Sequence, residues 1–267
     1  MDNRPIGVFD SGIGGLTVVK SLKESLPNET ICYVGDTARV PYGNKSKQRI
    51  QQFSKEIVKW LIQKNCKIII VACNTASSLA IEILKKEFSI PIFGVINPGV
   101  DYAIDATKTY KIGVLGTEAT IISDAYGEKI KSNNPNIHVV SKACPLFVPL
   151  VEEGLVEGSI PMSIAELYLK DFINTDIDTV ILGCTHYPIL KNIIKKIVGK
   201  DTVLVDSGEA TAIAVANDLK NNLLNGEVFQ GEINCFVTDS PSSFDTIASR
   251  FLKNKIASTE YIDLSKY

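Results

Sequence analysis

Short apolar runs alternate with amphipathic patterns along most of the chain. The first run, Ile6 to Phe9, ends at Asp10, and apolar residues at helical spacing follow from Leu16 to Leu26. Unbroken apolar runs of this length are typical of strands buried on both faces of a parallel sheet, and the spacing after them is typical of covering helices. We therefore predict an α/β fold with strands at residues 6–9, 30–34, 68–72, 90–96, 112–115, 137–140, 179–183, 202–205 and 234–238, and helices at residues 16–26, 50–61, 74–84, 120–131 and 159–173 and after residues 208 and 238.

Two of these predicted strands end at a cysteine in matching surroundings. One apolar run stops at Cys73 and another at Cys184, and polar residues and a helical pattern follow each. The carboxyl ends of parallel strands are where α/β sheets carry their functional groups. A single free cysteine is most often a buried core residue, but the repeated context favours a functional pair.

The alternation of strands and helices begins afresh near Gly99, and the turn Asp10-Ser11-Gly12 is echoed by Asp206-Ser207-Gly208. The echo and the paired cysteine strands predict two similar doubly wound α/β domains related by pseudo-two-fold symmetry, with the active site in the cleft between them. We expect the first domain to hold residues 1–98 and 207–267, and the second to hold residues 99–206. No low-complexity linker separates the halves, so we expect them to share a tight interface.

Composition and charge narrow the class of partner. The 267 residues suffice for two domains with cores of their own. A formal net charge of -2 gives no field that would gather nucleic acid or an anionic membrane, so we expect a small-molecule partner that is neutral or zwitterionic. The first apolar segment is too short for a signal peptide or a membrane span, and the six cysteines lack the C-x-x-C spacing of zinc or redox sites. We expect a cytoplasmic protein with reduced thiols.

The glycine-rich turn after the first strand runs from Asp10 to Gly15. A dinucleotide fingerprint would need a third glycine where Thr17 stands, and its acidic residue would lie downstream of the turn. Nucleotide binding is therefore disfavoured. Asp10 instead places a carboxylate at a strand end, facing the same crevice as Cys73.

Each cysteine has a neighbouring group that could activate a thiol. Asp10 serves this purpose for Cys73 and His186 for Cys184, and we expect both cysteines at helix N-termini. A hydrolase would leave one cysteine unused, and a metal site made of the two cysteines and His186 would lack a fourth ligand. A redox pair would leave no room for a substrate between its sulfurs. Racemisation at a carbon acid, by contrast, needs two bases on opposite faces of one carbon.

The chain also resembles the bacterial glutamate racemase family in several motifs that occur in the same order. The motifs that carry the resemblance are Asp10-Ser11-Gly12-Ile13-Gly14-Gly15-Leu16, residues 35–43, Ala72-Cys73-Asn74-Thr75-Ala76, Gly116-Thr117-Glu118-Ala119-Thr120, Cys144-Pro145-Leu146 through Glu152, and Gly183-Cys184-Thr185-His186-Tyr187-Pro188. They extend from residue 10 to the turn at residues 206–208, and the tail beyond Gly208 is less distinctive.

This resemblance implies a cofactor-independent enzyme without a metal, usually a homodimer, that interconverts L- and D-glutamate and supplies D-glutamate for peptidoglycan. It implies that Cys73 removes the α-proton of the D-enantiomer and Cys184 that of the L-enantiomer, with Asp10, His186 and Glu152 assisting. The residues that it implies for substrate binding are Asp10, Ser11, Pro41, Tyr42, Gly43, Asn74, Thr75, Thr117, Thr120, Thr185 and His186.

Three other functions stay open at this point. One is a cysteine hydrolase, which would form a trapped acyl-enzyme on one cysteine only. A racemase for aspartate or another acidic amino acid would use the same pair of thiols, because the two-base logic does not measure the length of the side chain. An amino-acid-binding protein without turnover would keep the crevice but would have no need of two thiols.

Overall fold

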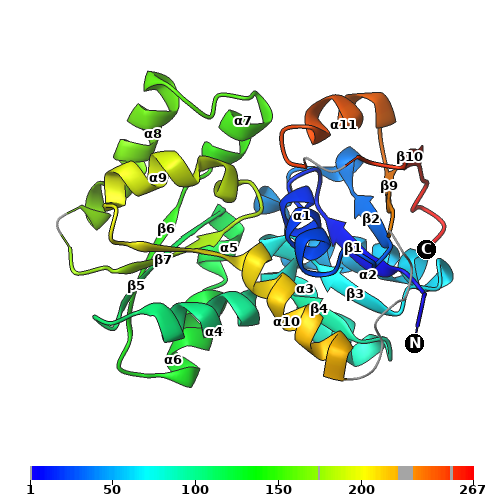
Figure 1. Cartoon of the computed structure of the whole chain (residues 1–267), viewed down its shortest axis with the longest axis horizontal. Helices are drawn as coiled ribbons and strands as arrows, with labels where there is room; N and C mark the ends of the chain where they lie inside the picture. Colours follow the sequence, from blue (N-terminus) through cyan, green and yellow to red (C-terminus); the bar gives the residue numbers. More distant parts are fainter. Residues whose placement is uncertain (1, 174, 222–230, 253–254) are drawn as a thin grey trace.

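The computed structural model describes residues 2–173, 175–221, 231–252 and 255–267, and it contains two parallel sheets in two lobes that stand side by side (Figure 1). The first sheet has six strands in the order β10-β9-β2-β1-β3-β4. Its strands are β1 (Ile6–Asp10), β2 (Ile31–Gly35), β3 (Ile68–Val71), β4 (Ile92–Gly94), β9 (Ile233–Val237) and β10 (Ser258–Tyr261). The second sheet has four strands in the order β6-β5-β7-β8, namely β5 (Lys111–Gly116), β6 (His138–Ala143), β7 (Thr179–Gly183) and β8 (Val203–Asp206).

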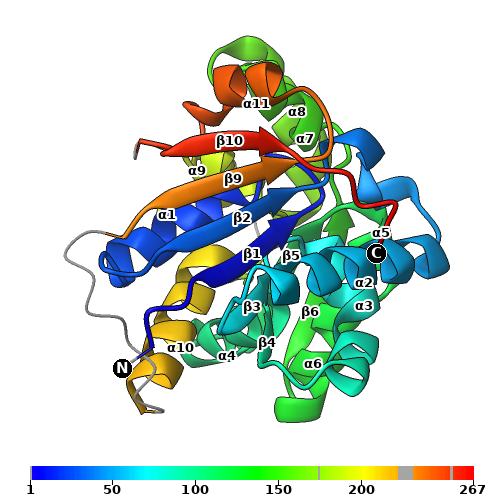
Figure 2. The same ribbon diagram turned by 90° about the vertical axis from the view of Figure 1, so that its right-hand side faces the viewer.

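Helices cover both faces of the first sheet, as Figure 2 shows. Alternate residues of β3 point to opposite faces. Ile70 belongs to the same apolar cluster as residues of α1 (Leu16–Ser25) and α10 (Ser207–Asn221), whereas Ile69 packs with residues of α2 (Lys47–Gln63) and α3 (Asn74–Glu87). The strand is apolar throughout because both of its faces are buried.

The second sheet is covered in the same way. Ile181 packs with α4 (Ile96–Ala106) and α6 (Ala125–Asn133), and Leu182 belongs to the cluster that contains residues of α7 (Phe147–Glu152), α8 (Ser159–Leu169) and α9 (Lys191–Val198). That cluster also contains Leu16 and Ile70 of the first lobe, so the two lobes share part of their core. Two short helices, α5 (Glu118–Ile122) and α11 (Pro241–Ala248), complete the set of α-helices in the described residues.

The same strand order occurs in both sheets. If the strands of each half are counted in sequence order, they lie in the order second, first, third, fourth. This order is β2-β1-β3-β4 in the first sheet and β6-β5-β7-β8 in the second. Cys73 follows the third strand of its sheet and Cys184 the third strand of the other. The predicted pair of doubly wound halves is thus confirmed. The Asp-Ser-Gly echo is not part of this symmetry, because Asp10 ends a first strand and Asp206 a fourth.

Several predicted boundaries are wrong for local reasons. The strand predicted to reach Ile96 ends at Gly94, and α4 begins at Ile96, with Pro98 in a first turn whose N–H groups have no helical partner anyway. The helix predicted through Lys131 is divided into α5 and α6 at Asp124, whose φ is 50°. The helix predicted to Ile173 ends as α8 at Leu169 and continues as the 3-10 helix η3 (Lys170–Phe172).

Strand β10 was not predicted at all, since its sequence Ser-Thr-Glu-Tyr has no apolar run. It lies at the outer edge of the first sheet, beside β9. All strands of the first sheet fall within residues 1–98 and 207–267 and all strands of the second within 99–206, and we keep this division as our proposal for the domains. Among the described residues, no helix combines the length and the apolar character that crossing a membrane requires.

Candidate functional site

A cavity of about 480 Å³ lies where the carboxyl ends of β1, β3, β5 and β7 meet. Both sulfur-bearing residues, Cys73 and Cys184, line it. The other residues that line it are Ser11, Gly12, Val40, Pro41, Tyr42, Gly43, Asn44, Asn74, Thr75, Thr117, Glu118, Pro145, Val148, Pro149, Glu152, Thr185 and His186.

Cys73 is the N-cap of α3, where backbone donors face its sulfur. The Sγ atom accepts from the N–H of Ala76 at 3.4 Å, and both the hydroxyl and the N–H of Ser11 also donate to it. Burial raises the pKa of the Cys73 thiol to about 12, the Asp10 carboxylate raises it further, and the donors from Ala76 and Ser11 oppose the shift. The thiol is therefore neutral at pH 7.

Asp10 is fully buried behind the wall of the cavity. Its carboxylate accepts from the N–H of Gly12 at 3.1 Å and from the hydroxyl of Thr185 at 3.5 Å. Burial raises the pKa of Asp10, while the charge of His186 and the neighbouring N–H groups counteract this rise. A carboxylate with a raised pKa is a stronger base than an ordinary one.

Cys184 lies beside an imidazole. Its Sγ is 3.9 Å from Nδ1 of His186, and the N–H of His186 donates to the sulfur. Burial raises the pKa of this thiol too, and the carboxylates of Asp10 and Glu152 add to the rise.

The α-helix N-terminus predicted at Cys184 is wrong. The chain turns at Thr185 and His186 and forms the 3-10 helix η4 (Tyr187–Leu190), and α9 begins only at Lys191. Pro188 explains the delay, because it has no N–H to donate to the carbonyl of Cys184 four residues earlier, and the N–H of Tyr187 bonds to that carbonyl instead. The sulfur of Cys184 thus receives its N–H from a turn.

His186 connects Cys184 to a second carboxylate. Its Nε2 lies 3.0 Å from Oε1 of Glu152, the last residue of α7. The side chain of His186 is only 6% exposed, whereas that of Glu152 is 41% exposed. The pair therefore extends from the buried sulfur towards solvent.

Three threonine hydroxyls join the two halves across the cleft. Oγ1 of Thr75, at the start of α3, lies 2.9 Å from that of Thr117 and 3.3 Å from that of Thr120, and the latter two are 2.9 Å apart. Thr117 caps α5 in the second half. Thr75 and Thr117 line the cavity, while Thr120 is buried beside them.

The loop from Val40 to Asn44 forms another wall. Its Val40–Pro41 peptide is cis, and the hydroxyl of the buried Tyr42 donates to the carboxylate of Asp36. The same carboxylate accepts from Nε of Arg39 at 2.7 Å and from the hydroxyl of Thr238 at 3.0 Å. Asp36 is fully buried and was not predicted as a site residue, although it belongs to one of the motifs that carry the family resemblance.

Asn74 is held by a hydrogen-bonded chain that passes through the second half and returns to the first. Its Nδ2 donates to the hydroxyl of Tyr126 at 2.7 Å, and that hydroxyl lies 3.0 Å from Oγ of Ser207. Tyr126 is fully buried in the second lobe, so Asn74 also connects the two lobes.

The structure brings together the residues predicted for this site, with two in supporting positions. Asp10 and Thr120 lie behind the lining, and the other predicted residues face the cavity. The residues that line it without having been predicted are Gly12, Val40, Asn44, Glu118, Pro145, Val148 and Pro149. Gly12, Val40, Asn44 and Glu118 are sequence neighbours of predicted residues, whereas Pro145, Val148 and Pro149 lie in the motif that ends at Glu152. Their place in or beside these motifs is the only sequence signal that could have indicated them.

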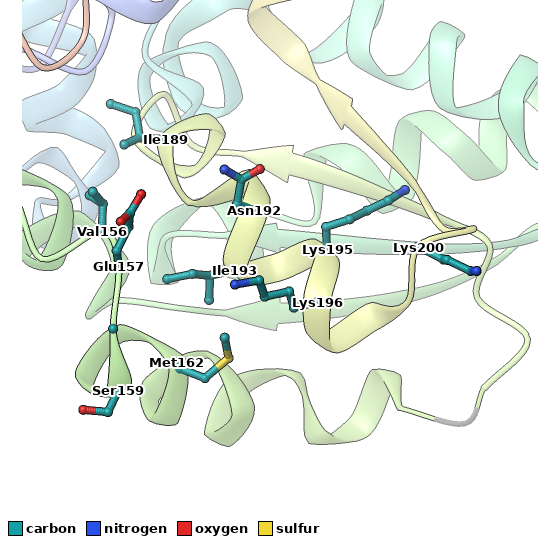
Figure 3. A pocket seen from close by; sticks show the side chains of 11 residues that line it. Val156, Glu157, Ser159, Met162, Ile189, Asn192, Ile193, Lys195, Lys196 and Lys200 are labelled. Carbon is teal, nitrogen blue, oxygen red and sulfur yellow. The ribbon is translucent and has the colours of Figure 1, made fainter.

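A larger hollow of about 990 Å³ lies elsewhere, between α8 and α9 (Figure 3). Its lining is Val156, Glu157, Gly158, Ser159, Met162, Ile189, Asn192, Ile193, Lys195, Lys196 and Lys200. No thiol or imidazole faces it, so it lacks the groups on which the predicted chemistry depends. Among the described residues, no group of three or more His, Cys, Asp and Glu side chains is arranged to hold a metal ion.

The family model of the Asp/Glu/hydantoin racemases matches residues 6–215, and the chain therefore belongs to this family of isomerases. The individual proteins that the chain resembles have a narrower activity than the family as a whole. It is 45% identical to the glutamate racemase of Geobacter metallireducens, over 98% of this chain and 97% of that protein.

Solved structures agree with this placement. The glutamate racemase isoform from Bacillus anthracis superposes with a TM-score of 0.95 at 40% identity, covering 99% of both chains. The glutamate racemase from Francisella tularensis, solved in complex with D-glutamate, superposes with a TM-score of 0.94 at 44% identity over 100% of both chains. The chain is thus an enzyme of the racemase class.

Proposed function

We propose that this enzyme interconverts L-glutamate and D-glutamate without a cofactor, by two thiols that act on opposite faces of the α-carbon. The observation that carries the proposal is that Cys73 and Cys184 line one cavity, each with its own set of proton-handling groups. Cys73 removes the α-proton of D-glutamate and Cys184 that of L-glutamate. In each direction the other thiol delivers a proton to the far face, and the configuration inverts.

The thiols need a proton acceptor, because burial raises the pKa of both. His186, 3.9 Å from the sulfur of Cys184, accepts the proton there and is oriented by Glu152. Asp10, whose own pKa is raised, accepts the proton of Cys73 and lies behind the residues that line the cavity. A base whose pKa approaches the working pH is the most effective in general base catalysis.

The substrate is held by neutral donors. Among the described residues that line the cavity there is no lysine or arginine, so hydroxyls and N–H groups must bind the carboxylates. We assign this to Ser11, Asn74, Thr75, Thr117 and Thr185, with Thr120 supporting the threonines and with Pro41, Tyr42 and Gly43 forming the wall. Fixed donors in a poorly hydrated cleft stabilise the negative charge that develops when the α-proton leaves.

Glutamate is the substrate favoured by the comparisons. The relative from Geobacter metallireducens is named a glutamate racemase, and the structure from Francisella tularensis contains D-glutamate. Polarimetric assays with glutamate and aspartate side by side test the choice. We expect kcat/KM to favour glutamate by roughly 10- to 200-fold, the usual worth of one methylene. A preference for aspartate would overturn the substrate, and binding without turnover would overturn the enzyme mechanism.

We also propose the cellular setting that the family resemblance implies. The enzyme supplies D-glutamate for peptidoglycan in the cytoplasm, where its six cysteines stay reduced, and it works as a homodimer. Expression in a bacterium that requires D-glutamate should restore growth without the supplement. Light scattering of the purified enzyme should give the mass of two chains, and the mass of one chain would contradict the dimer.

A further inference from the structure

The turn that follows α11 reaches from the first lobe to the second. Helix α11 lies between β9 and β10 in sequence, and Figure 1 shows it standing next to α7 of the other lobe. Arg250 and Phe251 stand two and three residues after the end of α11, and their N–H groups bond to the carbonyls of Ile247 and Ala248, each at 3.0 Å. The turn is thereby fixed to the helix.

Arg250 caps the end of α7. Its Nη1 donates to the backbone carbonyl of Glu152, the last residue of that helix. The last carbonyls of a helix have no intrahelical donor, and a cation is favoured there. Gly154 ends the helix with φ at 75°, and a Cβ on it would lie 3.3 Å from Cζ of Arg250. The backbone beneath Glu152 is thus held from the opposite lobe.

Phe251 packs against His186. The two rings meet edge to face, with their centroids 5.4 Å apart and their planes at 86°. Phe251 is 4% exposed and His186 5%, so the contact is buried. An edge-to-face contact restricts the plane of the imidazole. Two consecutive residues therefore touch both members of the His186–Glu152 pair.

We propose that Arg250 and Phe251 are positioning residues that aim the His186–Glu152 pair at Cys184. This inference rests on the proposed two-thiol racemisation. The groups that handle protons at Cys184 are then correctly placed only when the turn after α11 packs against the end of α7. The partners of Cys73, by contrast, come from the turn after β1 in the same half.

Isotope effects on kcat/KM with α-deuterated substrates test this role. Deuterated L-glutamate reports proton transfer to Cys184, and deuterated D-glutamate reports transfer to Cys73. In Phe251→Leu we expect kcat/KM to fall by about tenfold, equally in both directions because the enantiomers have the same free energy. The isotope effect should rise with the L-substrate and fall with the D-substrate, since transfer at Cys184 becomes the slower step.

Two further variants make the result decisive. Arg250→Gln, at an exposed position, should shift the isotope effects in the same directions by a smaller amount. Phe172→Leu is the matched control. Phe172 is 3% exposed and packs against Gly113 in the second lobe. The substitution therefore removes the same buried ring at a position away from His186. Its isotope effects should equal those of the unmodified enzyme, because partial unfolding lowers the rate but not the isotope effect.

Unchanged isotope effects in Phe251→Leu and Arg250→Gln, or effects that change alike for both enantiomers, would overturn the positioning role. The unmodified enzyme provides the separate check on the proposed function. If it does not racemise glutamate, or shows no isotope effect with either enantiomer, the two-thiol mechanism itself is wrong.

Discussion

The surroundings of Cys73 and of Cys184 differ although the two residues occupy equivalent places in the fold. Each follows the third strand of a sheet with the same strand order. Cys73 caps a helix of 14 residues and receives donors from Ser11, whereas Cys184 lies in a turn beside His186. The shared topology thus delivers the two sulfurs, and the proton-handling groups come from loops that differ between the halves.

This difference is hidden when kcat/KM is compared between the two directions. The equilibrium between enantiomers has a constant of one, so kcat/KM must be equal in both directions whichever thiol is slower. Isotope effects separate the two proton transfers and can show the asymmetry.

Removing either sulfur should abolish racemisation. Cys73→Ala and Cys184→Ala should each lower kcat by about 10⁴-fold or more, because each direction needs one thiol as base and the other as acid. Polarimetry gives the rate and circular dichroism the fold. Cys144→Ala is the matched control, since this buried cysteine does not line the cavity. Substantial activity in either single variant would end the two-base proposal.

Removing one assisting group should slow proton transfer at one of the two thiols only. His186→Asn and Asp10→Asn should each lower kcat/KM by roughly 10²- to 10³-fold, in the range of general acid–base effects. With α-deuterated L-glutamate the isotope effect should grow in His186→Asn, and with the D-enantiomer it should grow in Asp10→Asn. The same pattern in both variants would contradict the assignment of one group to each thiol.

A methyl group at Gly14 should disturb the Cys184 side. A Cβ there would lie 2.5 Å from Cε1 of His186, so the imidazole must move, and a shift near 1 Å costs about 100-fold in rate. Gly43→Ala is the milder counterpart, because its Cβ would lie 3.2 Å from Cβ of Thr117, a distance that a small shift accommodates. We expect kcat of Gly14→Ala to be the lower of the two, and the reverse order would contradict the geometry.

The reactivity of the two thiols should depend on pH. Burial raises the pKa of Cys73 to about 12 and also raises that of Cys184, so the reactive thiolate is scarce at pH 7 and increases as the pH rises. Alkylation of each residue by iodoacetamide, followed by mass spectrometry, should accelerate by about tenfold per pH unit between pH 7 and 10. A plateau below pH 9 for either thiol would mean that its pKa is not raised.

The strands and the two cysteines could be predicted from the sequence because both depend on local patterns. An apolar run buried on both faces predicts β3 and β7, and the residue after each run lies at the site. The turn after Cys184 and the split at Asp124 were missed, because they depend on single residues with unusual backbone requirements.

The contacts that support the site could not be predicted from the sequence, for another reason. Arg250 and Glu152 are 98 positions apart, and Asn74 and Tyr126 are 52 apart. Neither pair belongs to a repeating pattern, and each forms only when the two lobes close on one another. Asp36 could have been found by its motif alone, but its role in holding Tyr42 required coordinates.

The unequal exposure of the two carboxylates has a consequence for where hydrogen comes from. Glu152 reaches solvent with 41% of its side chain exposed and connects the Cys184 side with bulk water, whereas Asp10 is sealed at 0%. We therefore expect the proton on His186 to exchange with bulk water through Glu152. A proton held by Asp10 has no such side-chain route and must leave through the cavity itself, which both sulfurs line.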